Sequence, residues 1–144
     1  MITPFKNPTA GKLFGSYASG GVLYNHTFDM AQYTNTVPGG EPDSWYSGYV
    51  SDQIPTQANG GVGQNDTFES NPAVDAGFKA GRNGVAQADR KGGYVAAGKA
   101  LAADLPEIPL YQQLTVNAYN NKLGGYKANA DFWFNNSNDW YLNS

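Results

Sequence analysis

The sequence contains no cysteine, and only 15% of its 144 residues are charged. Without cysteine no disulfide can form, and no thiolate can act as a nucleophile or metal ligand. Nine Lys and Arg face twelve Asp and Glu, and no basic run occurs, whereas nucleic-acid binding needs clustered positive charge. The longest apolar runs span only a few residues. The sequence therefore predicts a protein that neither binds nucleic acid nor spans a membrane.

Histidine is almost as scarce, since His26 is the only one. A Ser-His-Asp triad would need His26 as its base, yet no serine lies in a Gly-x-Ser-x-Gly motif. The chain also lacks the Gly-x-x-x-x-Gly-Lys-Ser/Thr loop that cradles nucleotide phosphates. Asn136, Asn138 and Asp139 do not have the spacing of a calcium-binding EF-hand. We therefore expect a protein that is not an enzyme and that holds no cofactor and no metal.

Glycine, tyrosine and proline are abundant, with 18, 10 and 8 residues. Many Tyr, Asn, Gly, Ser and Thr with few charges are common at extracellular surfaces and in sites that hold neutral polar ligands. A loop-rich surface would have the same composition, so the counts leave both interpretations open. Residues 1–6 lack the apolar stretch of a secretory signal. Either the protein is cytosolic, or the sequence does not begin where its gene product begins.

Local patterns predict several elements along the chain. Apolar and polar residues alternate over 27–34, which predicts a strand. The stretch 35–71 is irregular, and loops of that length are usually functional or disordered, but its aromatic residues argue against disorder. Two helices are expected over 72–83 and 89–104. Residues 108–119 are typical of a strand that breaks midway.

The C-terminal end combines a turn with short aromatic segments. Lys122–Tyr126 contains two glycines and predicts a turn. Residues 132–134 and 139–142 are aromatic and predict short strands or turns. We expect Trp133 and Trp140 to pack this end of the chain.

The two predicted helices have clear end signals. Asn71 is a good N-cap, and Pro72 suits the first helical turn. Asp89 is a possible cap for the second helix, which Pro106 ends because the residue before a proline is pushed out of the α region. In the first helix, Val74 and Phe78 are expected inside, together with Ala73 and Gly77. The expected inner stripe of the second helix is Tyr94, Val95, Gly98, Leu101, Ala102 and Leu105.

Glycine is unusually frequent in these two helices, at positions 77, 81, 92, 93 and 98. Each helical glycine costs about 0.5–1 kcal/mol relative to alanine. The pair therefore needs support from tertiary packing. Two explanations are open: the helices are weakened, or they pack unusually close to each other.

A series of segments in fixed order adds a family resemblance. Asn-Pro-x-x-Asp occurs at 71–75, Asp-Arg at 89–90 and Pro-x-Ile-Pro-Leu-Tyr at 106–111. The flanking segments are FDMAQYT, EPDSWYSGYVSDQIP, NGGVGQND, LGGYKAN and NDWYL. Together they resemble the family 5 extracellular solute-binding proteins, which are the peptide- and oligosaccharide-binding receptors of ABC importers. The resemblance covers nearly the whole chain.

The resemblance implies an α/β fold, namely the C-terminal part of the second lobe of a periplasmic-binding-protein-like bilobal fold of type II. Family members are typically several times longer, so the chain is expected to be one partial domain, incomplete as a lobe. Its parts would be a first strand region (1–34), a long ligand-side loop (35–71), two helices (72–105), and a return strand with the C-terminal end (106–144). The missing signal peptide would then reflect truncation.

The resemblance also implies partners and a location. The partners are a peptide or oligosaccharide ligand, the remainder of the bilobal receptor, and the permease of an ABC importer. The location is extracytoplasmic: the cell surface, the periplasm or the medium.

The expected ligand contacts are Tyr33, Thr34, Asn35, Trp45 and Tyr46. Aromatic faces with neighbouring amide and hydroxyl groups suit sugars and peptide backbones. Trp45 and the nearby Tyr49 have an alternative role in the core of the lobe. Peptide-binding members commonly hold the ligand's amino group with an acid just after the first strand, and no acid follows Tyr33 before residue 41. This departure favours a neutral ligand such as an oligosaccharide.

Two functions of different classes follow. The first is a non-catalytic segment of a substrate-binding protein, in which ligand is captured between lobes. In isolation this segment is expected to bind ligand weakly or not at all. The second is a self-assembling structural subunit, an oligomer or filament derived from such a receptor, because a partial lobe leaves strand edges and apolar faces uncovered.

Overall fold

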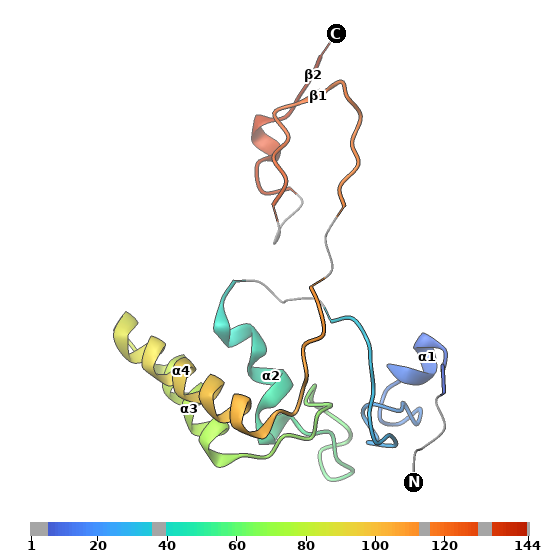
Figure 1. The fold of residues 1–144 in the computed structure, drawn as a ribbon, viewed down its shortest axis with the longest axis vertical. Coiled ribbons are helices and arrows are strands. Elements are labelled where there is room, and N and C mark those ends of the chain that lie inside the picture. Colours follow the sequence, from blue (N-terminus) through green and yellow to red (C-terminus); the bar gives the residue numbers. More distant parts are fainter. Residues whose placement is uncertain (1–5, 36–39, 113–115, 130–133, 144) are drawn as a thin grey trace.

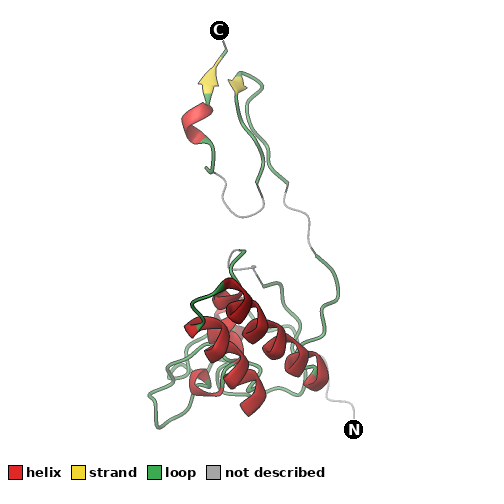
Figure 2. Cartoon of the chain, turned by 90° about the vertical axis from the view of Figure 1, so that its left-hand side faces the viewer, coloured by secondary structure: helices red, strands yellow, loops and turns green. Residues whose placement is uncertain are grey.

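The computed structural model describes residues 6–35, 40–112, 116–129 and 134–143. The described residues up to 112 form a mainly helical body, and those from 116 to 143 form a separate C-terminal arm that stands away from it (Figure 1). The α-helices lie in the body, whereas the arm contains the two strands and one short 3-10 helix at residues 137–139 (Figure 2). The elements are α1 (Ala10–Leu13), η1 (Pro42–Trp45), α2 (Tyr46–Tyr49), η2 (Ser51–Gln53), α3 (Pro72–Asn83), α4 (Gln87–Asp104), β1 (Leu123–Gly124), η3 (Ser137–Asp139) and β2 (Tyr141–Leu142).

The expected start and end of α3 are confirmed. The Asn71 side chain accepts a hydrogen bond from the backbone N–H of Ala73, and Pro72 occupies the first turn. The helix ends at Asn83, with Gly84 as its C-cap. Two local signals, an amide that satisfies a free N–H group and a proline that lacks one, therefore fix the start of this helix.

The second helix, α4, begins two residues earlier than the sequence predicts. Ala86 is its N-cap and provides no side-chain hydrogen bond, so the expected cap at Asp89 is wrong. Asp89 lies instead in the first turn, where its negative charge complements the positive end of the helix dipole. The helix ends at Asp104 as expected, and Leu105 turns out of it with a positive φ of 51°.

The helices α3 and α4 pack against each other through glycine. Gly93 lies so close to α3 that a Cβ atom there would overlap the backbone nitrogen of Gly81. A Cβ on Gly77 would lie 2.5 Å from the backbone nitrogen of Ala97. In contrast, Gly92 and Gly98 face open space. The close approach that the sequence offered as one explanation therefore accounts for three of the five glycines.

This contact also corrects the expected inner face of α4. Its buried residues are Gly93 and Ala97, whereas Val95 is 46% exposed and Leu105 is 60% exposed. Glycine and alanine add little to a hydrophobic pattern. The pattern of the larger apolar residues therefore placed the inner face of α4 wrongly. In α3, Val74, Gly77 and Phe78 are buried as predicted, and Ala73 is exposed.

The core of the body lies where α3 and α4 meet the short helices before them. Its buried members are Val50, Val74, Phe78 and Ala97. Partly buried residues pack around them: Trp45, Tyr46, Tyr49, Tyr94, Ala100 and Leu101. The stretch 35–71 is therefore less irregular than predicted, because η1, α2 and η2 supply part of this core.

Polar contacts fasten the stretch 40–71 to the helices. Asp75, in the first turn of α3, accepts a hydrogen bond from the backbone N–H of Ser51 at 2.8 Å. The fully buried amide of Asn65 donates to the carbonyls of Val50 and Glu69, both at 2.9 Å. Because a buried amide needs partners, these bonds hold the loop in one conformation.

The two longer strands expected from the sequence do not form among the described residues. Residues 27–34 have no strand pairing, and Met30 is 88% exposed. The described parts of 108–119 also lack strand pairing, and 113–115 lie outside the described residues. An alternating pattern makes a strand only where a partner supplies the ladder of hydrogen bonds. Within the described ranges, the sheet consists of β1 and β2 alone.

The arm is a small antiparallel hairpin. Leu123 pairs with Leu142 and Gly124 with Tyr141, so the turn expected over Lys122–Tyr126 is partly strand. The expectation for residues 139–142 is confirmed at β2, whereas 132 and 133 lie outside the described residues. The side chain of Asn136, only 8% exposed, donates to the carbonyl of Gly125 at 2.6 Å.

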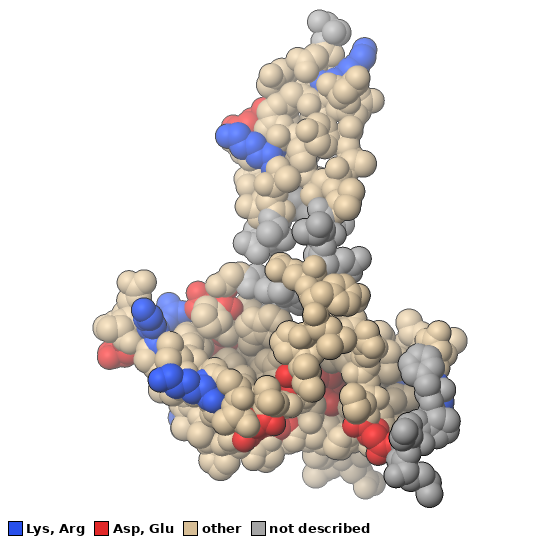
Figure 3. Space-filling view, in the orientation of Figure 1, with Lys and Arg blue, Asp and Glu red and all other residues tan. Residues whose placement is uncertain are grey.

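The described residues thus form a small, mainly helical structure with one two-stranded sheet. The expected bilobal α/β receptor fold concerns a larger assembly than these elements, and it stays a prediction. Across the described parts of the chain, none of the helices combines the length and the apolar character needed to cross a bilayer. Most of the visible surface of body and arm is uncharged (Figure 3), in keeping with the low charge of the sequence.

Candidate functional site

A cavity of about 230 Å³ opens in the body where the extended segment that contains Tyr33 approaches α2. Drug-sized ligands occupy pockets of roughly 300–1,000 Å³, so this cavity has room for one sugar ring or one peptide side chain. Its lining is mixed, with aromatic, amide, hydroxyl and carboxylate groups: Phe14, Tyr24, Tyr33, Asn35, Ser44, Trp45, Ser47, Gly48, Tyr49, Gln64, Asp66 and Glu107.

The first polar pair in the cavity joins Tyr33 to Asp66. The Tyr33 hydroxyl donates to Oδ2 of Asp66 at 2.8 Å. Burial, followed by this bond to the carboxylate, raises the pKa of Tyr33 far above its ordinary value of 10.0. Burial also raises the pKa of Asp66, while the bond from Tyr33 opposes that change. Tyr33 therefore stays protonated and holds the Asp66 carboxylate in a fixed orientation.

A second pair of the same kind joins Tyr49 to Glu107. The Tyr49 hydroxyl donates to Oε2 of Glu107 at 2.7 Å. Burial and this bond raise the pKa of Tyr49 well above 10.0, so the phenol stays neutral. Glu107 follows the end of α4, and Tyr49 is the last residue of α2. This hydrogen bond therefore holds the segment that follows α4 against the cavity.

The two carboxylates set the electrostatic character of the cavity. Among the described residues, its lining includes Asp66 and Glu107 and no Lys, Arg or His. The indole of Trp45 and the ring of Tyr49 lie 6.2 Å apart between centroids and provide apolar faces. Acceptor oxygens beside aromatic faces suit a group that donates hydrogen bonds, such as an ammonium or a sugar hydroxyl, and they disfavour an anion.

The structure brings three of the five predicted ligand contacts to this cavity. Tyr33, Asn35 and Trp45 line it. Thr34 is exposed and is not part of the lining. Tyr46 lies elsewhere, where its ring packs edge-on against Phe78, with 6.1 Å between centroids.

The contacts of Tyr46 stabilise the body and lie outside the cavity. Its hydroxyl donates to Asp52 at 3.1 Å, and the Arg82 guanidinium lies 4.2 Å from the ring centroid. Tyr46 and Tyr49 are three residues apart on α2, and of the two only Tyr49 lines the cavity. The sequence assigned Tyr46 to the ligand and left Tyr49 open, whereas the cavity contains Tyr49.

Sequence reasoning missed the acids of the cavity. Asp66 and Glu107 lie 33 and 58 residues away from the tyrosines that they contact. No acid follows Tyr33 along the chain before Glu41, but in the folded body Asp66 contacts Tyr33 directly. The Gly-rich segment at 59–66, already part of the family resemblance, was the signal that could have placed Gln64 and Asp66 here.

A second, apolar hollow of about 190 Å³ is also lined by Trp45 and Tyr49. Its further lining residues come from the core and from α4: Pro42, Phe78, Tyr94, Gly98 and Leu101. Within the described residues, no group of three or more His, Asp or Glu side chains could hold a metal ion.

Comparison with models of known protein families, with characterised proteins and with solved structures finds no match to this chain. The resemblance to the solute-binding receptors thus rests on the motifs of the sequence itself.

Proposed function

We propose that this chain is a non-catalytic, ligand-binding segment of an ABC-transporter substrate-binding protein that captures peptides or oligosaccharides outside the cytoplasm. The observation that carries the proposal is the cavity that gathers Tyr33, Asn35 and Trp45, three residues expected to contact ligand. The motif order at 71–75, 89–90 and 106–111 supports the same receptor family. In this role the chain works with the remainder of the receptor and with an importer permease.

The chemistry of the cavity narrows the part of the ligand that it contacts. The cavity has room for one small group, and its two charged residues, Asp66 and Glu107, accept hydrogen bonds. Asp66 and Glu107 restore a partner for an amino group, which the sequence alone did not place. Peptides and oligosaccharides therefore both remain candidate ligands. They differ in that a peptide has a free amino group, which an experiment can use to distinguish them.

Isothermal titration calorimetry of the whole chain tests the proposal. We expect short peptides or cello- and xylo-oligosaccharides to bind with a Kd on the order of 1 mM, because one small cavity supplies few contacts. Trp45→Ala should weaken this binding about tenfold or more. Asp66→Asn should weaken the binding of peptides with a free amine and spare oligosaccharides. Asp89→Asn, on the exposed start of α4, is the matched control.

Two outcomes would contradict the proposal. One is the absence of binding by every peptide and sugar tested. The other is binding that Trp45→Ala and Asp66→Asn leave unchanged, since the ligand would then lie outside the cavity.

A second candidate function, self-assembly, is favoured by the exposed area. The structure exposes 10747 Å², whereas a compact monomer of this size exposes ~7,200 Å². Several large apolar side chains contribute, including Met30 at 88%, Val116 at 89% and Leu142 at 80%. Surface of this kind is usually covered by another chain. Sedimentation analysis over a range of protein concentrations tests self-assembly. A chain that stays monomeric at every concentration would contradict it.

A further inference from the structure

The segment between α4 and the arm has an unusual backbone. Residues 107–112 follow the helix and rise from the body as extended chain, seen in orange in Figure 1. All six are exposed, with Ile108 at 69%, Leu110 at 65% and Tyr111 at 74%. Among the parts of the chain that the structure describes, their backbone N–H and C=O groups form no hydrogen bond to other backbone groups. Such a row of free groups is a template for an added strand.

Only one edge of this segment can accept a strand along its whole length. In extended chain, the N–H and C=O groups of alternate residues face the same edge. Ile108, Leu110 and Gln112 supply three N–H donors to one edge. The opposite edge carries Pro109, which has no N–H and interrupts the ladder. The proline therefore blocks one edge and leaves the other intact.

We propose that the edge formed by Ile108, Leu110 and Gln112 pairs antiparallel with the same edge of a second copy of this chain, centred on Leu110. In this register Leu110 faces Leu110, and Ile108 faces Gln112 in both directions. Each facing pair exchanges two backbone hydrogen bonds, and an antiparallel match of a segment with itself has the two-fold symmetry of most dimers. The proposal rests on the second function above, self-assembly.

The position of the one charged residue in the segment and the large exposed area of the chain are compatible with a second copy as the partner. Glu107 is the single charged residue of the segment and lies at its end, so the two copies hold their glutamates at opposite ends of the pair. Stable interfaces bury about 1,200–2,000 Å², and the excess exposed area of this chain is larger than that. Pairing brings the two exposed Leu110 side chains next to each other on one face, because facing residues of an antiparallel pair have Cβ atoms about 4.5–5.5 Å apart.

Cysteine crosslinking tests the register, because the natural chain contains no cysteine to interfere. Leu110→Cys should form an intermolecular disulfide under mild oxidation, since facing residues lie within disulfide reach. Ile108→Cys alone should not, because two such residues lie four positions apart, or about 14 Å. A mixture of Ile108→Cys and Gln112→Cys should crosslink as a heterodimer. Ala96→Cys, exposed on α4, controls for random collision.

Two proline variants test the pairing edge without cysteine. Leu110→Pro removes a donor from the pairing edge, and Tyr111→Pro removes one from the opposite edge. In sedimentation experiments, Leu110→Pro should weaken dimer formation about tenfold or more, and Tyr111→Pro should have little effect. Equal effects of the two prolines, or equal crosslinking at 110 and 96, would overturn the edge pairing while self-assembly could still stand. A natural chain that stays monomeric would overturn both.

Discussion

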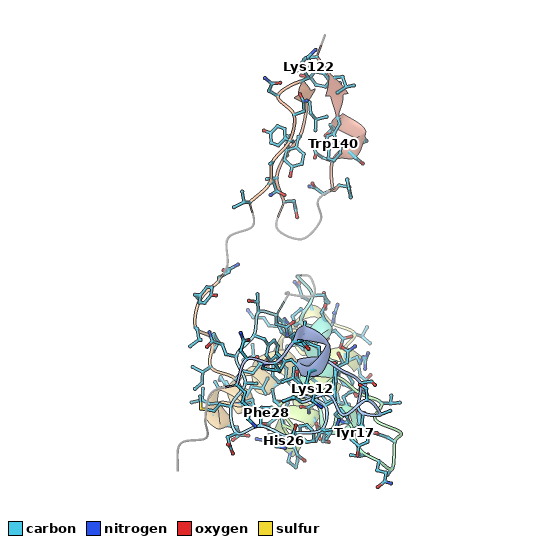
Figure 4. The ribbon with its side chains drawn as sticks, turned by 90° about the vertical axis from the view of Figure 1, so that its right-hand side faces the viewer. Lys12, Tyr17, His26, Phe28, Lys122 and Trp140 are labelled. Atoms are coloured by element: carbon cyan, nitrogen blue, oxygen red, sulfur yellow. The ribbon has the colours of Figure 1, made fainter. Side chains whose placement is uncertain are left out.

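The helical body and the C-terminal arm are held together by different means. The body buries Val50, Val74, Phe78 and Ala97 in one cluster. In the arm, Asn136 is the only buried residue among those described. The hydrogen bonds of Asn136 and the ring contacts of Trp140 hold the arm together in place of an apolar core. Figure 4 shows the labelled Lys122 and Trp140 of the arm apart from the labelled Lys12, Tyr17, His26 and Phe28 of the body.

This difference indicates where stability and binding reside. A two-stranded hairpin is marginal by itself, because it cannot bury enough apolar surface. The body has a core and also contains the cavity, whose residues come from segments that the core fixes. We therefore expect substitutions in the body to change the free energy of unfolding and substitutions in the arm to act locally.

The largest expected effect is at the centre of the body. Phe78→Ala removes a side chain that is 4% exposed and should lower the free energy of unfolding by about 3–5 kcal/mol. Phe134→Ala, in the arm and 68% exposed, should change it by less than about 0.5 kcal/mol. Urea unfolding followed by far-UV circular dichroism compares the two. Similar losses would show that the arm shares the core of the body.

The glycine contact between α3 and α4 gives a smaller and more specific test. Gly93→Ala forces a methyl group into the backbone of Gly81 and should destabilise the body by about 1–3 kcal/mol. Gly92→Ala meets open space and should stabilise it by about 0.5–1 kcal/mol, because alanine favours the helix. The same unfolding assay applies. Changes of the same sign in both variants would contradict the close packing.

A local effect is expected in the arm. Asn136→Ala removes the bond to Gly125 and the acceptor that the Trp140 indole uses at 3.1 Å. The loss should be about 1–3 kcal/mol and confined to the arm. Hydrogen exchange should show faster exchange over 122–127 with unchanged protection in α3 and α4. Faster exchange in the helices would mean that body and arm unfold together.

The smallest effect concerns alkaline pH. The raised pKa of Tyr33 means that the unfolded chain loses this proton near pH 10.0 while the folded chain keeps it. The contribution of Tyr33 to the free energy of unfolding is therefore complete below pH 10.0 and declines as the pH rises through the pKa of the folded state. Stability above pH 10.0 should fall less steeply in Tyr33→Phe than in the natural chain. Tyr111→Phe, at an exposed tyrosine, is the control, and an equal change in both would contradict the burial of Tyr33.

Local signals made part of the fold predictable. Asn71 with Pro72 gave the start of α3, and Pro106 gave the end of α4, because a cap and a proline act on neighbouring backbone. The face of α4 was not predictable, since Gly93 and Ala97 carry too little hydrophobicity to form a pattern. The strands expected over 27–34 and over the described parts of 108–119 do not form, because a strand depends on a partner that the sequence does not specify.

The cavity was predictable in its aromatic part and not in its acids. Tyr33, Asn35 and Trp45 stood out through residue type and through the family resemblance. Asp66 and Glu107 join them only through folding over long sequence separations. Their carboxylates can accept hydrogen bonds from an ammonium, so a peptide suits this cavity as well as the neutral ligand, such as an oligosaccharide, that the sequence favoured.

Nuclear magnetic resonance of the tryptophan indoles tests the ligand site most directly. Trp45 lies in the cavity, and Trp140 lies in the arm. When a short peptide with a free amine, or an oligosaccharide, is titrated into the whole chain, the account predicts that the Trp45 indole resonance shifts and saturates. The Trp140 resonance should stay in place. A shift of Trp140 without Trp45, or no shift with any of these ligands, would contradict the proposed cavity.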